Sequence, residues 1–281
     1  MGLFNRERIA GKTLEQLAGM RVAGLLVGQT LALLADTVRP GMTTLELDTL
    51  AETHIRDHGG VPNFQLVPGY RHTLCTSVND EIVHGIPGDR VLQEGDLLSI
   101  DCGAQVEQWN GDAAFSCIVG GREAGRPEDL ALIDATEASL WAGIAALRVG
   151  SPLYAVGAAV EDSLAAAGER AGREYGIVED YVGHGIGTSM HMDPQVPNYR
   201  VSGKGPTVPE GLTIAIEPMV TLGAQDNHVL ADEWTVSTDD GSRAAHWEHS
   251  VAVTSAGITV LTALDGGEAR LRALCAPFAA L

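Results

Sequence analysis

Cysteines and basic residues are both scarce in this sequence of 281 residues. The four cysteines form no C-x-x-C pair and are too few to make a disulfide framework in a chain of this length. Lys and Arg together number 18 against 37 for Asp and Glu, and the net charge of −19 disfavours binding to nucleic acid or to an anionic membrane surface. We therefore expect an acidic, soluble protein of the reducing cytoplasm.

Long hydrophobic segments are also missing. Residues 1–12 carry several charges and no apolar core, so we expect no signal peptide. The most apolar stretch, residues 22–35, is too short to span a membrane, so it predicts a helix that faces the core. With 45% apolar residues and no linker-like segment, residues 1–281 are expected to form a single domain.

Acidic residues end two segments that otherwise have the composition of buried strands. Residues 97–100 lead into Asp101, and residues 213–216 lead into Glu217. A buried carboxylate is strongly destabilising unless it is protonated, paired or bound to a metal. Several such acids in one fold therefore suggest a metal site.

The two acid-bearing segments belong to an internal repeat. The same Glu-Gly pair precedes both, at positions 94–95 and 210–211, which are 116 positions apart. The next apolar segments that carry an acid, around Asp112 and Glu248, lie 136 positions apart, so loop insertions lengthen the second copy.

Each copy of the repeat predicts the order helix, helix, strand, strand. Capping patterns place the expected helices at 13–39, 43–58, 127–147 and 151–172. We expect an α+β fold whose two halves, about 13–120 and 127–262, face each other about a pseudo-twofold axis. The four acids would then meet in one cleft, while the tail at 266–281 has helical composition and no counterpart in the repeat.

Histidine and carboxylate chemistry favours metal-assisted hydrolysis. Asp101 and Asp112 suit two adjacent antiparallel strands, and the alternative interpretation is a hairpin at the surface. His184 lies among glycines, which let the backbone approach other groups closely, although a lone histidine is more often structural. Such ligands without thiolate suit Mn, Fe, Co, Ni or Zn. Two such ions would activate a water and polarise a carbonyl, and no serine nucleophile motif offers an alternative.

Together with the segment from Asn79 to Pro87, these motifs resemble the type I methionine aminopeptidases of the short form, from about Thr13 to Leu261. The resemblance implies the pita-bread fold, a centre of two divalent metal ions, and removal of the initiator methionine from nascent polypeptides with a small second residue. It implies Asp101, Asp112, His184, Glu217 and Glu248 as metal ligands, with Asp112 and Glu248 bridging both ions.

The resemblance also implies roles for residues around the metal. Glu217 is expected to shuttle the proton, His84 to contact the scissile amide nitrogen, and His191 to stabilise the oxyanion. The expected methionine pocket is apolar, and ordinary core is the alternative interpretation of its members. Those members are Phe64, Tyr70, Cys75, Met190 and Trp234.

The expected partners follow from the same resemblance. No cysteine-rich extension precedes residue 13, so any contact with the ribosome would use the catalytic domain, and we expect a monomer. Two competing hypotheses remain. One is an Xaa-Pro aminopeptidase or prolidase of the same fold, and the other is a binding protein that has kept the fold without catalysis.

Overall fold

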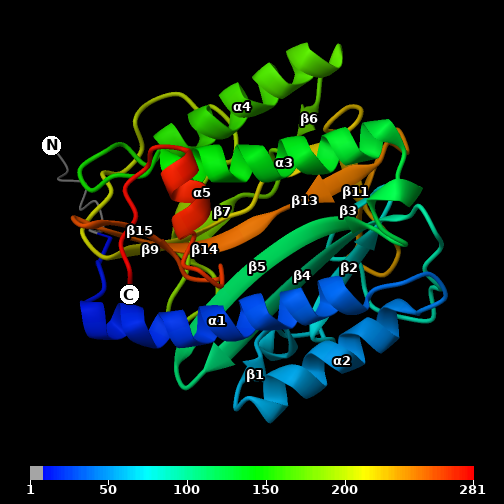
Figure 1. The fold of residues 1–281 in the computed structure, drawn as a ribbon, viewed down its shortest axis with the longest axis horizontal. Helices are drawn as coiled ribbons and strands as arrows, with labels where there is room; N and C mark the ends of the chain where they lie inside the picture. Colours follow the sequence, from blue (N-terminus) through cyan, green and yellow to red (C-terminus); the bar gives the residue numbers. More distant parts are fainter. Residues whose placement is uncertain (1–8) are drawn as a thin grey trace, which may run out of the picture.

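The computed structural model describes residues 9–281 and contains five α-helices within that range. The helices are α1 (Leu14–Thr37), α2 (Thr44–Asp57), α3 (Pro127–Ala145), α4 (Ala155–Ala171) and α5 (Glu268–Ala273). In Figure 1, α1 and α2 run along the bottom of the molecule, and α3 and α4 run together along the top. The expected order of two helices and then strands is therefore observed in the first half and again in the second.

Nine strands form the main sheet, and two three-stranded sheets lie beside it. The strands are β1 (Val61–Pro62), β2 (Leu74–Val78), β3 (Glu81–Val83), β4 (Leu97–Val106), β5 (Trp109–Ile118), β6 (Gly176–Ile177), β7 (Gly183–Gly185), β8 (Met192–Val196), β9 (Leu212–Ile216), β10 (Met219–Thr221), β11 (Asn227–Val229), β12 (Val236–Thr238), β13 (Ala244–His246), β14 (Glu248–Thr254) and β15 (Gly257–Val260). The path through the main sheet is β1-β4-β5-β14-β9-β7-β8, with β2 paired to β4 and β15 paired to β14.

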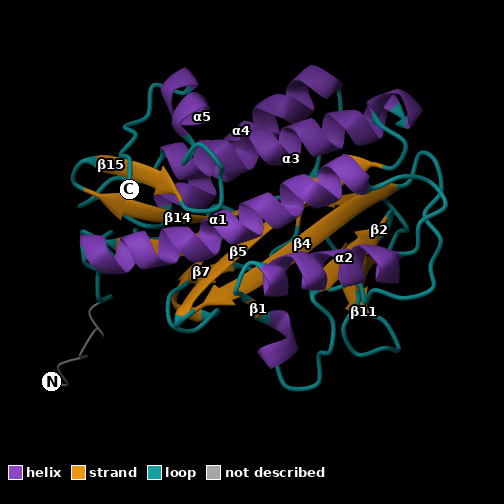
Figure 2. Cartoon of the chain, turned by 60° about the horizontal axis from the view of Figure 1, so that its bottom comes forward, coloured by secondary structure: helices purple, strands orange, loops and turns teal. Residues whose placement is uncertain are grey.

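The middle of the main sheet joins the two expected halves of the chain. Strand β5 pairs with β14 antiparallel, with Ala114 opposite Glu248 and Ala113 opposite His249. Figure 2 shows the helices packed against these strands. This central pairing is the arrangement that two facing halves require, although a structural repeat of 13–120 in 127–262 stays a prediction.

Side-chain alternation along the central strands separates the core from the acids. Ile100 and Cys102 of β4 are buried in a cluster with residues of α1 and α2. Successive strand residues point to opposite faces, so Asp101 between them points away from these helices. In the second half, the His249 ring packs 5.4 Å from that of Trp141 in α3, and the neighbouring Glu248 points to the other face.

Local capping explains where the first two helices begin. Thr13 and Thr43 each accept a hydrogen bond from a backbone N–H three residues later, and Gln16 and Glu46 return the bond. These are the capping boxes expected from the sequence. Helix α1 is 24 residues long, longer than the stretch 22–35, and by length and composition it could cross a membrane. Half of its most apolar window is buried, and the helix packs against β4 and β5.

The expected start of the fourth helix is wrong. Helix α4 begins at Ala155, and its N-cap Tyr154 makes no capping hydrogen bond through its side chain. Pro152 instead forms a bridge with Thr207, and the backbone N–H of Leu153 donates to Pro206. Backbone contacts of residues 152–153 with residues 206–207 are therefore formed where the sequence predicted the start of the helix.

Two further expectations from the sequence are wrong, namely a hairpin turn at 109–111 just before Asp112 and a strand over 232–234. Trp109 begins β5, so the turn of the β4–β5 hairpin lies at 107–108 and not at the residues just before Asp112. Trp234 does not lie in a strand but in the turn between β11 and β12, where the Asp232 carboxylate accepts from its backbone N–H.

The tail at 266–281 forms α5 and packs Phe278 against the core of the second half.

A buried ion pair ties α3 to the neighbouring sheet. The Asp129 side chain is fully buried and accepts hydrogen bonds from Arg126 and from Arg243, the latter at 2.6 Å. Arg243 also donates to the backbone carbonyl of Gly95 at 2.9 Å. Removing one partner of a buried carboxylate leaves its charge poorly compensated.

We predict that Arg243→Met lowers the free energy of unfolding by about 2–4 kcal/mol, measured by chemical denaturation. The matched control is Arg122→Met, which breaks the exposed pair with Asp134. We expect the control to cost no more than about 1 kcal/mol. Equal losses in the two variants would contradict the structural role of the buried pair.

Candidate metal centre and substrate cavity

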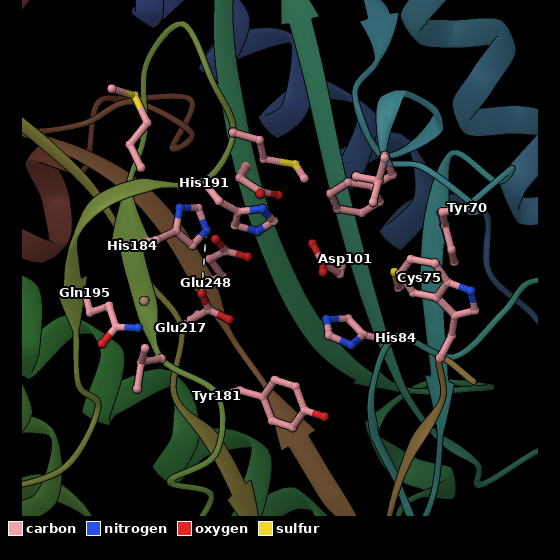
Figure 3. A pocket seen from close by; sticks show the side chains of 18 of the residues that line it. Tyr70, Cys75, His84, Asp101, Tyr181, His184, His191, Gln195, Glu217 and Glu248 are labelled. Atoms are coloured by element: carbon pink, nitrogen blue, oxygen red, sulfur yellow. Dashed lines mark ion pairs between the residues drawn. The ribbon is translucent and has the colours of Figure 1, made fainter. Parts of the chain in front are cut away.

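One cavity of about 570 Å³ gathers every site residue expected from the sequence. The twelve residues are Phe64, Tyr70, Cys75, His84, Asp101, Asp112, His184, Met190, His191, Glu217, Trp234 and Glu248. They come from segments up to 184 positions apart in the chain, since Phe64 and Glu248 both line the wall. Figure 3 shows this cavity from close by.

The strand registers explain why the carboxylates converge. Ala114 of β5 lies opposite Asp101 of β4 on one side and opposite Glu248 of β14 on the other. Residues directly opposite one another share a face of the sheet, and so do residues two apart in one strand. Asp101, Asp112 and Glu248 therefore all project from the same face, as the sequence predicted for the first two.

Histidine and glutamate from the second half complete the group. His184 lies in the middle of β7, and Glu217 directly follows β9. Ligand atoms of Asp112, His184 and Glu248 all lie within 4.8 Å of one another. The His184 Nε2 and Glu217 Oε1 atoms are 3.6 Å apart, the pair joined by the dashed line in Figure 3.

Burial and mutual repulsion disfavour negative charge on these acids. Burial raises the pKa of Asp101 to about 7. Burial, and then the neighbouring carboxylates, raise the pKa values of Asp112, Glu217 and Glu248 well above their ordinary values. A cation among them would reverse this balance, because it favours the ionised form of every carboxylate around it.

The buried oxygen atoms fit a metal ion. Three of them lack a hydrogen-bond partner among residues 9–281, namely Asp101 Oδ1, Asp112 Oδ1 and Glu248 Oε1. Buried polar atoms without partners are rare in folded proteins and call for a specific explanation. Four carboxylates and one imidazole form a donor set suited to divalent transition metals. The cluster therefore has both the chemistry and the unused donor capacity of a metal centre.

Two further histidines lie beside the acids. The ring of His191, in the loop between β7 and β8, lies 4.4 Å from the ring of His184. His84 directly follows β3 and has a φ of 61°. Burial, and then the charge of His191, lowers the pKa of His84 to about 4, and burial lowers the pKa of His191. Both rings are neutral at neutral pH and can donate a hydrogen bond to a developing charge.

An apolar pocket adjoins the acids through the pairing of β2 with β4. Cys75 of β2 lies opposite Asp101 in that register. The ring centroid of Tyr70 lies 5.0 Å from that of Trp234 and 6.5 Å from that of Phe64. Burial raises the pKa of Cys75, so its thiol stays neutral and acts as an apolar, polarizable wall. Met190 packs against the same group.

Asp48 of α2 anchors the segment that carries this pocket. Its buried carboxylate accepts the backbone N–H groups of Thr73 and Leu74, each at 2.8 Å. The Tyr70 hydroxyl in turn donates to the Leu74 carbonyl at 2.7 Å. Helix α2 thereby fixes both Tyr70 and Cys75 next to the acids.

Seven residues of the cavity wall were not among those expected from the sequence, namely Val67, Tyr181, Val182, Gly183, Met192, Asp193 and Gln195. Val67 packs with the apolar pocket, and Gln195 lies in β8 near the opening. The ring of Tyr181 packs edge-on against that of His84, with centroids 5.5 Å apart. Tyr181 lies three positions before His184, and this closeness is the only sequence signal that could have identified it.

The cavity thus combines a candidate metal centre, two neutral histidines that can donate hydrogen bonds, and an apolar pocket for a side chain. The nucleophile that such a site activates is water.

The comparisons with known proteins agree with this interpretation. Residues 18–255 match the model of metallopeptidase family M24. A relative from Mycobacterium tuberculosis (strain CDC 1551 / Oshkosh), named methionine aminopeptidase 1, is 48% identical over 92% of this chain and 97% of its own length. A crystal structure of methionine aminopeptidase from Thermotoga maritima is 35% identical, with a TM-score of 0.85 over 91% of this chain and all of that one.

A more distant structure supports the fold alone. A prolidase from Pyrococcus furiosus superposes with a TM-score of 0.65 at 18% identity, over 89% of this chain and 64% of that chain. The chain thus has the pita-bread fold, and it uses divalent metal cofactors. It belongs to metallopeptidase family M24 and, within that family, to the methionine aminopeptidases.

Proposed function

We propose that this protein hydrolyses the peptide bond after an N-terminal methionine of a nascent polypeptide, and that it prefers a small second residue. The observation that carries the proposal is the contact between an apolar pocket and a group of metal ligands within one cavity. A methionine side chain in the pocket would place the following carbonyl over the acids.

The residues proposed to hold two divalent ions are Asp101, Asp112, His184, Glu217 and Glu248. The ligand atoms of Asp112 and Glu248 lie within 4.8 Å of each other and of His184. Each of these two carboxylates offers two oxygen atoms, so these two would be shared between the ions. Divalent cations bound there supply the positive charge that polarises a peptide carbonyl and lowers the pKa of a water.

Three side chains are proposed to manage the proton and the developing charge. The Glu217 carboxylate accepts a proton from the attacking water and passes it to the leaving amide nitrogen as the C–N bond breaks. His191 donates a hydrogen bond to the carbonyl oxygen as it gains negative charge. His84 contacts the scissile amide nitrogen, and its packing against Tyr181 fixes the plane of its ring.

The walls of the pocket match an unbranched thioether side chain. Phe64, Tyr70 and Trp234 supply aromatic surface, and sulfur next to an aromatic ring is a favourable contact. Cys75 and Met190 add polarizable surface of their own. We assign these five residues to recognition of the methionine.

Location and partners are proposed on the same basis. We propose a cytoplasmic monomer that meets nascent chains at the ribosome through its catalytic domain. The four cysteines are all unpaired, which fits a reducing compartment. Helix α1 packs against β4 and β5, which fits a soluble protein.

Metal-stripped protein should release free methionine from Met-Gly-Met-Met only after a metal is restored. We would supply Co, Mn, Fe, Zn and Ni separately and measure the methionine released, which would also rank the ions. A peptide that begins with Ala-Pro is the control. Preference for that peptide would favour an Xaa-Pro peptidase, and no activity with any metal would favour a binding protein.

Glu248→Gln and Asp112→Asn should each lower kcat/KM by roughly a thousandfold or more and reduce the metal content, because each removes a charge shared by two cations. Metal content would be measured by mass spectrometry of the purified protein. Glu233→Gln is the control, since Glu233 is exposed beside Trp234 and should retain the metal. Full activity in either bridging variant would refute the two-ion assignment.

His191→Ala should lower kcat by roughly a hundredfold and leave the metal bound, because we assign His191 to the carbonyl oxygen and not to the metal. Steady-state kinetics and metal analysis of the same preparation would measure both quantities. Loss of metal from this variant would make His191 a ligand.

A further inference from the structure

A second groove of about 670 Å³ lies behind the strand that forms one rim of the cavity. Three residues of β8, Met192, Asp193 and Gln195, line both the cavity and the groove. The groove and the candidate active site are therefore neighbours that share β8, an edge strand of the main sheet. Its other walls include Ile9, Lys12, Tyr154, Pro194, Pro206 and Leu212.

The groove adjoins the side of the acids on which the remainder of a bound polypeptide would lie. Figure 3 shows Gln195 on the opposite side of the acids from Tyr70 and Cys75. With the first side chain in the apolar pocket and the scissile bond at the acids, one open direction for the following residues leads past Gln195. Apolar and aromatic walls with a few polar groups are the usual lining of a peptide-binding groove.

Lys12 is a cation in this groove whose charge is poorly compensated. Its Nζ donates to the Thr213 hydroxyl at 2.5 Å, and Thr213 in turn donates to the Ile186 carbonyl. No carboxylate of residues 9–281 lies within ion-pair distance of that Nζ. Burial lowers the pKa of Lys12. An anionic group in the groove would supply the ion pair that Lys12 lacks within the described residues.

The position of Lys12 sets the part of a substrate that could reach it. Thr213, its hydrogen-bond partner, lies four residues before Glu217 along β9. Four residues of extended chain span roughly 13 Å. Counted from a scissile bond at the acids, the fifth or sixth residue of an extended substrate is the first that would come near Lys12, while the exposed Asp193 lines both the cavity and the groove and would face earlier positions.

We propose that this groove binds the third to sixth residues of the substrate polypeptide and that Lys12 favours an acidic side chain at the fifth or sixth. The inference rests on the proposed function, because the groove gains a substrate only if the cavity holds a polypeptide N-terminus. Two observations support this occupant, namely the wall of β8 that the groove shares with the cavity and the positive charge of Lys12 in the groove.

The test compares hexapeptides that begin with Met-Ala and carry either Asp or Asn at one of positions three to six, with alanine elsewhere. The tripeptide Met-Ala-Ser, too short to reach Lys12, is the reference substrate. We expect Asp at position five or six to raise kcat/KM over Asn by about threefold to tenfold, and this ratio to fall with added salt. Asp at position three should give no such gain.

Three variants assign the effect to Lys12. Lys12→Gln should bring the Asp to Asn ratio to about one and keep tripeptide turnover within about twofold, while Lys12→Arg should preserve the ratio. Arg39→Gln removes one positive charge from the exposed turn between α1 and α2 and should preserve it as well. Thermal melting would verify that each variant is folded.

The outcomes separate the two proposals. If wild-type protein cleaves the tripeptide and shows no preference for Asp at any position, the groove proposal is overturned and the proposed function stands. A preference that survives in Lys12→Gln, or that disappears equally in Arg39→Gln, also overturns it. If the metal-loaded protein does not cleave the tripeptide, the proposed function itself has failed.

Discussion

The rest of the structure depends on the cost of holding four carboxylates together on one buried face of a sheet. Burial raises the pKa values of all four, and the neighbouring carboxylates raise those of Asp112, Glu217 and Glu248 further. Three of their oxygen atoms lack a hydrogen-bond partner among the described residues. The surrounding strands and helices must be stable enough to hold this arrangement, and a cation bound among the acids would offset much of its cost. The large helix-covered core on the other face of the sheet serves that requirement.

Local signals in the sequence predicted the elements and the chemistry well. The capping boxes at Thr13 and Thr43 depend on residues three positions away, so a short window contains the whole interaction. An acid at the end of an apolar strand is similarly visible without any long-range information. The resemblance to the family then identified all twelve predicted site residues, and the structure places each of them on the wall of one cavity.

What the sequence did not reveal depends on contacts between distant segments. The signal at Ser151 and Pro152 failed because the backbone there pairs with residues 206 and 207. Tyr181 was missed because its role follows from the position of His84, nearly a hundred residues earlier. The groove beyond β8 has no motif at all, since it combines residues that precede α1 and α4 with residues of β8 and β9.

The pairing of β5 with β14 at the centre of the sheet has a consequence for how the protein is made. Because Asp101 and Asp112 precede their partner Glu248 by more than a hundred residues, an unfinished chain on the ribosome has the first two acids and no complete site. Contacts of such long sequence separation form late and slowly. An unfinished chain thus lacks one of the acids proposed to hold the metal, and its first half must hold two acids in an apolar sheet until the last strands are made.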